Sequence, residues 1–151
     1  MKRLVIVCIA MLISGHGKAA PEAVLPSQQV KYEVVDGDTF RILNRKTGNR
    51  TGWPDIRIYG IDTPEIRTRC ASEKILGLRA KARLQSLLAT GPVKLERVAR
   101  RYDARGRRLL RVYVGGKDVV GVLVGEGLGR VYTGGLRASW CEPGFKLPAA
   151  Y

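Results

Sequence analysis

Residues 30–43 read VKYEVVDGDTFRIL and contain two short runs rich in valine, isoleucine and aromatic residues. Such residues favour β-strands, and the Asp36-Gly37 pair between the runs is typical of a tight turn. We therefore expect strands over Val30–Val35 and Thr39–Leu43, one on either side of this turn. A loop rich in lysine, asparagine and glycine should follow the second strand.

The next two predicted elements are a strand and a helix. The strand covers Asp55–Ile61 and ends at Thr63-Pro64, because proline cannot donate a hydrogen bond to a strand ladder. The helix covers Ser72–Ala89, with Ser72 as its N-cap and a stop before Gly91-Pro92. Apolar residues recur at helical spacing on its expected buried face: Leu76, Ala80, Leu84, Leu87 and Leu88.

A hairpin and a second helix complete the predicted domain. Strands over Val93–Ala99 and Leu109–Val114 flank an arginine-rich loop. A short helix follows, with Asp118 as N-cap and Gly127 in the C′ position. Its inward residues should be Val120, Leu123 and Val124. This order of elements predicts a mainly β (α+β) domain, a closed or nearly closed five-stranded barrel with two packed helices, for which the OB-fold is the natural candidate.

The N-terminal segment has the layout of a secretory signal peptide, with Lys2-Arg3 before the apolar run Leu4–Ile13. This run is too short for a transmembrane helix, which needs roughly 20 apolar residues. We expect cleavage after Ala19, with Ala20 and Ala23 as alternatives; an uncleaved, buried segment is the other reading. The protein should then be secreted or periplasmic, without stable membrane association. The expected regions are a signal peptide over 1–19, a domain over 30–141 and a tail over 142–151.

Cleavage would remove Cys8 and His16, the one histidine of the chain. A mature chain without histidine excludes Ser-His-Asp and Cys-His catalytic sites, and two cysteines alone cannot complete a zinc site. The remaining cysteines, Cys70 and Cys141, allow one internal pairing, and exported thiols usually become oxidised. We expect a disulfide between them; two unpaired thiols are the alternative.

The chain is strongly basic. Its formal net charge is +14, and loss of Lys2, Arg3 and Lys18 would lower it by three, to +11. Such an excess favours polyanionic partners, nucleic acid above all. Residues 97–111 concentrate the charge, because they contain seven arginines and one acid, Asp103. A solvent-exposed surface with no role in binding would contain the same cluster of charged residues.

Short segments of the chain combine carboxylates with arginines: Asp36-Gly37-Asp38-Thr39, Arg57, Asp62-Thr63-Pro64-Glu65, Asp103 and Gly106-Arg107. Two acids can hold a hard cation, a third can orient water, and two guanidiniums can neutralise a phosphate under attack. The set predicts a metal-assisted phosphodiester hydrolase. Taken singly, the acids could instead stabilise turns, and Arg57 could pair with a surface acid.

Gly60 lies between two members of this set, Arg57 and Asp62. Residues five apart in a straight strand point to opposite faces of a sheet. Both can serve one site only if the strand bends, and glycine inside a strand often marks a bulge. We therefore predict a kink or a break in the strand ladder from Gly60 to Asp62.

These segments, in this order, resemble the staphylococcal nuclease (thermonuclease) family. The resemblance runs from about Lys31 to Tyr132 and rests on five motifs, which are Val35-Asp36-Gly37-Asp38-Thr39, Ile56-Arg57, Ile61-Asp62-Thr63-Pro64-Glu65, Asp103-Ala104-Arg105-Gly106-Arg107 and Leu123-Val124-Gly125-Glu126-Gly127-Leu128. It implies an OB-fold and a calcium-dependent nuclease that cuts DNA and RNA with little sequence preference. The products would carry 3′-phosphates.

The resemblance also implies roles for six residues. Ca²⁺ would be held by two carboxylates and one main-chain carbonyl, those of Asp38, Asp62 and Thr63. The attacking water would be held by Glu65. The scissile phosphate would be contacted by two guanidiniums, those of Arg57 and Arg107. Asp36 is adjacent in sequence to the metal motif. We expect it to contact the metal ligands and not the metal itself, so it is not counted among the six site residues.

Two features depart from the family pattern. Arg105 stands where the family usually has a tyrosine that contacts the nucleotide, and Tyr102 is a candidate to compensate. After Trp140-Cys141 the sequence runs to Tyr151 and omits most of the family's long C-terminal helix. We expect the disulfide to replace that clamp.

Two other classes of function compete with the enzyme. A noncatalytic OB-fold protein could bind single strands by charge and stacking alone. A basic envelope protein could bind anionic glycans or lipids, although the chain shows no amphipathic helix with a large apolar face. Glu65, Arg57 and Arg107 are all present, which favours the enzyme over the binder. We expect its substrates to be DNA and RNA, with single strands preferred, and we expect a monomer, since nothing in the pattern requires more.

Overall fold

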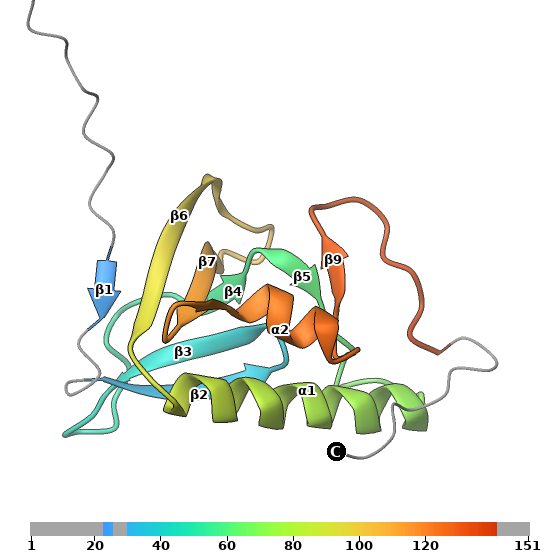
Figure 1. Ribbon diagram of the computed structural model, residues 1–151, viewed down its shortest axis with the longest axis horizontal. Helices are drawn as coiled ribbons and strands as arrows, with labels where there is room; N and C mark the ends of the chain where they lie inside the picture. Colours follow the sequence, from blue (N-terminus) through green and yellow to red (C-terminus); the bar gives the residue numbers. More distant parts are fainter. Residues whose placement is uncertain (1–22, 26–29, 142–151) are drawn as a thin grey trace, which may run out of the picture.

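The computed structural model describes residues 23–25 and 30–141 (Figure 1). The predicted signal peptide over 1–19 and the tail over 142–151 lie outside the described residues. Two helices and one large sheet make up most of the described chain. Neither of these helices is long and apolar enough to cross a membrane.

The large sheet contains four of the strands predicted from the sequence and the first part of the other one, Asp55–Ile61. β2 (Val30–Asp36) pairs antiparallel with β3 (Thr39–Asn44), and β3 pairs antiparallel with β4 (Ile56–Ile58). β4 runs parallel to β7 (Arg108–Val114), which forms the expected hairpin with β6 (Val93–Tyr102). β6 extends further into the arginine-rich stretch than predicted, to Tyr102.

Two short strands extend this sheet. β1 (Ala23–Leu25) pairs with β6, and β8 (Lys117–Asp118) pairs with β7. The resulting order is β1-β6-β7-β4-β3-β2, and within the described residues its two ends are not paired. The sheet is therefore open among the described residues, and the predicted closure into a barrel is not observed there. The predicted fold class, a mainly β OB-fold of the staphylococcal nuclease type with two helices, is confirmed.

α1 (Ala71–Ala89) lies along the sheet beside β2 and covers the core (Figure 1). All five apolar residues predicted for its inner face are buried, and they pack against inward residues of the strands such as Phe40 and Ile56. The predicted N-cap at Ser72 is wrong. The cap is Cys70, which makes no side-chain cap bond. Glu73 fixes the start of the helix instead, because its carboxylate accepts hydrogen bonds from Glu65 N and Thr68 Oγ1.

α2 (Val119–Gly125) begins and ends as the sequence predicts. The Asp118 carboxylate accepts a 3.1 Å hydrogen bond from Val120 N, and Gly127 follows the C-cap with φ of 69°. Leu123 is fully buried, whereas Val120 and Val124 are partly buried against the core. Val119, which was not predicted, is buried as well.

The third predicted strand breaks next to Gly60. β4 ends at Ile58, and β5 (Gly60–Asp62) leaves the large sheet to pair with β9 (Arg130–Tyr132). Gly60 has a φ of +95°, which L side chains rarely adopt. The predicted break is confirmed, and it lets residues from β4 and β5 face one site.

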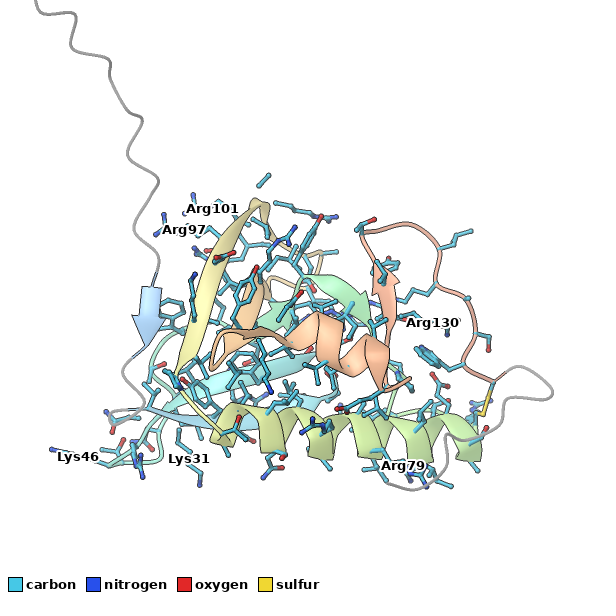
Figure 2. The ribbon with its side chains drawn as sticks, viewed as in Figure 1. Lys31, Lys46, Arg79, Arg97, Arg101 and Arg130 are labelled. Carbon is cyan, nitrogen blue, oxygen red and sulfur yellow. A yellow bond between two sulfur atoms is a disulfide. The ribbon has the colours of Figure 1, made fainter. Side chains whose placement is uncertain are left out.

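Cys70 and Cys141 form a disulfide across 71 residues of sequence. It joins the start of α1 to the end of the described chain, where Figure 2 draws the sulfur bond beside α1. The predicted pairing is therefore present in the structure. It holds the segment after β9, residues 133–141, close to the loop that carries Asp62 and Glu65.

Candidate active site

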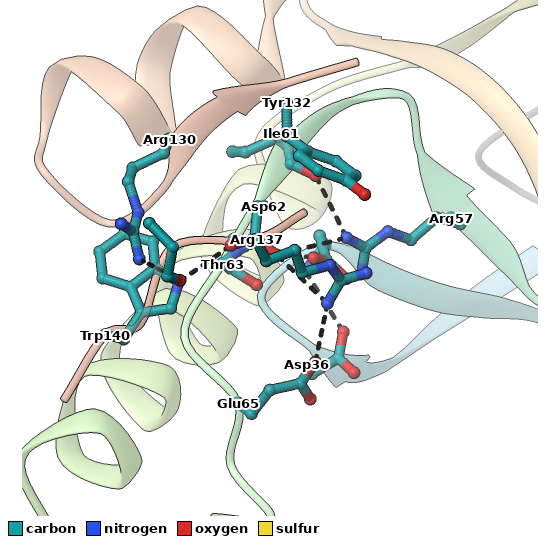
Figure 3. A network of polar contacts seen from close by, with 12 residues as sticks. Asp36, Arg57, Ile61, Asp62, Thr63, Glu65, Arg130, Tyr132, Arg137 and Trp140 are labelled. Carbon is teal, nitrogen blue, oxygen red and sulfur yellow. Dashed lines mark hydrogen bonds and ion pairs between the residues drawn. The ribbon is translucent and has the colours of Figure 1, made fainter. Parts of the chain in front are cut away.

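Strands and turns from distant parts of the sequence bring the predicted site residues together, and Figure 3 shows Arg57, Asp62, Thr63 and Glu65 among them. Asp38 comes from the β2–β3 turn, Arg57 from β4 and Asp62 from the end of β5, with Thr63 directly after it. These four polar residues are almost completely buried, with exposed fractions of 1, 5, 4 and 3% respectively. Buried charges need partners, so their contacts define the site.

Asp38 lies at the centre of a polar network. Its Oδ1 accepts a 2.9 Å hydrogen bond from Thr39 Oγ1 and forms an ion pair with Arg57, while its Oδ2 accepts a 3.3 Å bond from Thr63 N. Burial raises the pKa of this carboxyl to about 7; Arg57 opposes the rise, and the neighbouring Asp36 adds to it. A bound cation would restore the charged form.

Asp62 has one satisfied oxygen and one unsatisfied oxygen. Its Oδ2 accepts a 3.0 Å hydrogen bond from the indole Nε1 of Trp140. Its Oδ1 lies 3.2 Å from Arg137 Nη1 and 3.9 Å from Arg57 Nη2, but it is buried and receives no hydrogen bond from the described residues. A buried carboxylate oxygen in this state has lone pairs available for a cation.

Arg57 crosses the site from β4. Besides its ion pair with Asp38, it donates a 3.2 Å hydrogen bond from Nη2 to the carbonyl of Ile61. Burial lowers the pKa of this guanidinium, and Asp38 opposes that effect. Arginine side chains are effectively always protonated in proteins, so Arg57 stays charged at neutral pH.

Arg107 is held by the turn that joins β6 to β7. Asp103 Oδ1 accepts 2.9 Å hydrogen bonds from the main-chain N of Arg105 and of Arg107, and Gly106 has a φ of 75°. Asp103 Oδ2 accepts a 2.7 Å bond from Arg107 Nε. Arg107 Nη1 also donates to Thr39 Oγ1 at 3.1 Å, which links this arginine to Asp38. The Asp-x-Arg-Gly-Arg motif thus builds a turn that aims one guanidinium at the site.

Glu65 is the least constrained of the predicted residues. Its side chain is 44% exposed, and its Oε1 lies 3.2 Å from Arg137 Nη1. Its main chain is fixed, since Glu65 N donates to Glu73 on α1. Asp36 lines the same cleft as Glu65, and its Oδ1 accepts a weak, 3.4 Å hydrogen bond from Asp38 N.

Two clefts meet at this site. One, of about 260 Å³, is lined by Arg57, Arg107, Arg137 and Tyr132 among others, and we call it the arginine cleft. The second, of about 510 Å³, is lined by residues that include Asp36, Thr39, Glu65, Arg105 and Arg107, and we call it the Glu65 cleft. Arg105 and Arg107 line both clefts. The two clefts therefore lie on either side of these arginines.

The donors present suit a hard divalent cation. The carboxylates of Asp38 and Asp62 and the main-chain carbonyl of Thr63 are oxygen ligands, the type that Ca²⁺ and Mg²⁺ take. Asp62 Oδ1, which is buried and has an ion pair with Arg137 but no hydrogen bond from the described residues, is the clearest sign of such a site. No histidine or thiol stands among these donors, so the chemistry of the set does not favour zinc.

The structure adds two site residues that the sequence did not predict, Arg137 and Trp140. Both lie in the segment after β9, and both contact Asp62. No local motif marked them, because their position depends on the pairing of β5 with β9 and on the disulfide at Cys141. Arg130 packs on Trp140, with its guanidinium carbon 3.7 Å from the ring centre.

Comparison with known proteins identifies the family. The family model described as staphylococcal nuclease homologue matches residues 55–139. Endonuclease YncB of Bacillus subtilis (strain 168) is 35% identical over 100 residues, which are 65% of this chain and 44% of that protein. The SPbeta prophage-derived endonuclease YokF of the same organism is 38% identical over 99 residues, 65% of this chain and 32% of that protein. The chain thus spans less than half the length of these two relatives. It belongs to the staphylococcal nuclease homologue family.

Proposed function

We propose that this protein is a calcium-dependent nuclease that hydrolyses phosphodiester bonds of DNA and RNA with low sequence specificity. The observation that carries the proposal is the site itself, in which two buried carboxylates lie close to a third acid and two arginines that line neighbouring clefts. Membership of a nuclease family and the two relatives named endonucleases support it.

The roles proposed for these residues are those that the family resemblance implies, and the positions of the side chains are compatible with them. Asp38, Asp62 and the Thr63 carbonyl would hold the cation, which when bound polarises a phosphate oxygen and assists deprotonation of water. Glu65, half exposed at the edge of its cleft, would accept a hydrogen bond from the attacking water and orient it. Arg57 and Arg107 would neutralise charge that develops on the phosphate oxygens. Departure of the 5′-oxygen would leave a 3′-phosphate.

The basic surface would attract the substrate. Figure 2 places Arg97 and Arg101 near the outer end of β6, and neither has an acidic partner among the described residues. Tyr132 lines the arginine cleft and Tyr102 is exposed, so unpaired bases could stack on either ring in competition with the arginine that lies near it, Arg137 or Arg108. These features support a preference for single strands. Nothing in the proposed mechanism needs more than a monomer.

We also propose that the protein is exported, into a periplasm or out of the cell. The signal-like segment at residues 1–19 and the disulfide support this placement. A reporter fused behind residues 1–30 should be exported, and its export should cease when Leu4–Ile13 is interrupted by charges. Retention of the unaltered fusion inside the cell would contradict the placement.

Cleavage of labelled oligonucleotides tests the nuclease proposal. Purified protein is incubated with single-stranded DNA, single-stranded RNA and duplex DNA in Ca²⁺, and then in excess chelator. We expect chelator-sensitive shortening, with 3′ ends that a polymerase extends only after phosphatase treatment. Glu65→Gln should lose roughly 100-fold or more in turnover, whereas Glu33→Gln, on the exposed face of β2, should not. Binding without shortening would identify the noncatalytic nucleic-acid binder instead.

A further inference from the structure

Arg137 reaches the candidate active site from the segment that follows β9. Its Nη1 lies 3.2 Å from Asp62 Oδ1 and 3.2 Å from Glu65 Oε1. Figure 3 shows the guanidinium between these two carboxylates, on the side of Arg57. One arginine therefore contacts both a proposed metal ligand and the residue proposed to hold the water.

The segment that carries Arg137 is anchored on both sides. Before it, β9 pairs with β5, and the hydroxyl of Tyr132 donates a 2.7 Å hydrogen bond to the carbonyl of Gly135. After it, Trp140 bonds to Asp62, and Cys141 is joined to Cys70. Arg130 Nη2 holds the intervening main chain, with hydrogen bonds of 3.1 and 3.0 Å to the carbonyls of residues 138 and 139. These contacts fix the main chain on both sides of Arg137 and so position its side chain at the site.

The side chain of Arg137 is also accessible from solvent. It is 38% exposed, it lines the arginine cleft, and its guanidinium carbon lies 5.3 Å from the centre of the Tyr132 ring. Arg57 and Arg107 line the same cleft. Three guanidiniums therefore face one cleft beside the proposed position of the scissile phosphate, and a planar guanidinium fork matches phosphate geometry.

The contact with Asp62 has a consequence for cation binding. Asp62 Oδ1 faces Arg137 at 3.2 Å and has no hydrogen bond from the described residues, so it is the oxygen most available to a cation. A divalent cation and a guanidinium on one oxygen repel each other. Binding of either to Asp62 must therefore weaken binding of the other.

We propose that Arg137 is a third substrate-binding arginine, and that its guanidinium competes with the divalent cation for Asp62. The cation would displace the guanidinium from Asp62 towards the arginine cleft, where it would bind a phosphate of the nucleic acid. This inference rests on the proposed nuclease function. It adds a residue that contacts substrate and opposes cation binding.

Three variants test the two halves of the inference separately. Arg137→Gln removes the charge and the fork, Arg137→Lys keeps the charge and removes the fork, and Lys117→Gln removes a charge from exposed β8 as the control. Calorimetry measures the Kd for Ca²⁺ without nucleic acid, and cleavage of a single-stranded oligonucleotide gives KM and kcat. Thermal unfolding checks that each variant folds.

We expect opposite changes in the two affinities. Arg137→Gln should bind Ca²⁺ about threefold tighter, because a competing cation is removed, while its KM for the oligonucleotide rises about tenfold. Arg137→Lys should leave the Kd for Ca²⁺ within about twofold of the wild-type value but raise KM, because lysine lacks the fork. Lys117→Gln should change neither.

The experiment distinguishes failure of the inference about Arg137 from failure of the proposed nuclease function. A wild-type protein that binds Ca²⁺ and cleaves, beside an Arg137→Gln variant with unchanged Kd and KM, overturns the inference and leaves the proposed function standing. Weaker Ca²⁺ binding by a folded Arg137→Gln also overturns it, since that result would make Arg137 a support of the metal site. A wild-type protein that neither binds Ca²⁺ nor cleaves overturns the proposed function itself.

Discussion

Replacing Asp103 with asparagine should loosen Arg107 without unfolding the β6–β7 turn. The substituted side chain can still accept hydrogen bonds from the main-chain N of Arg105 and Arg107 through its amide oxygen. The 2.7 Å bond from Arg107 Nε to the second oxygen is lost, because an amide nitrogen would face the guanidinium there. Hydrogen bonds to charged groups contribute about 1.5–3 kcal/mol. The side chains of Asp103 and Arg107 are 17% and 16% exposed, so water weakens the bond and we take about 1.5 kcal/mol.

If the transition state depends on a positioned Arg107, this loss converts to about a tenfold decrease in kcat/KM. The assay is cleavage of a single-stranded oligonucleotide under saturating Ca²⁺, with thermal unfolding as the check on folding. Asp118→Asn, which alters the cap of α2 away from Arg107, is the matched control. An Asp103→Asn enzyme with wild-type kcat/KM would refute the reasoning that Asp103 positions a catalytic arginine.

Three further substitutions test the framework around the site. Trp140→Phe removes the indole donor to Asp62 and should weaken Ca²⁺ binding about tenfold by calorimetry; unchanged affinity would show that the bond does not tune the ligand. Cys141→Ser opens the disulfide and should lower the free energy of unfolding in urea by up to about 4 kcal/mol, whereas equal stability would contradict its role as a clamp. Gly77→Ala places a Cβ 2.8 Å from the carbonyl oxygen of Pro64 and should destabilise the protein by about 1–3 kcal/mol. A stabilised Gly77→Ala variant would mean that helix propensity outweighs this clash.

Local patterns in the sequence were sufficient for most of the fold. The apolar stripe of α1, the turn at Asp36-Gly37 and the cap at Asp118 each follow from residues close in sequence, and all three are present. The break at Gly60 was predictable because strand parity required it if Arg57 and Asp62 share a site. The first residue of α1 was not predictable. No side chain at the N-cap position makes a capping hydrogen bond, and the Glu73 carboxylate instead accepts hydrogen bonds from the preceding loop.

The site was predictable only where its residues belong to motifs. Asp38, Arg57, Asp62 and Thr63 meet in the structure as the segments suggested, although their roles remain predictions. Arg137 could not be predicted in this way. The segment that carries it is brought to Asp62 by the β5–β9 pairing and by the disulfide, both of which join residues far apart in sequence. Sequence proximity predicts turns and helix faces, whereas the carboxylate partners of a loop arginine depend on the assembled fold.

The Ca²⁺ concentration that gives half-maximal cleavage, compared between the wild-type protein and Asp62→Asn, tests the account most directly. Asparagine preserves the size of the side chain and can still accept the bond from Trp140, but it removes the charge that would hold the cation. We expect the wild type to saturate with Ca²⁺, and we expect the half-maximal concentration to rise at least about tenfold in the folded variant. The same Ca²⁺ dependence in both proteins, or cleavage that persists in excess chelator, would contradict the claim that Asp62 holds a catalytic cation.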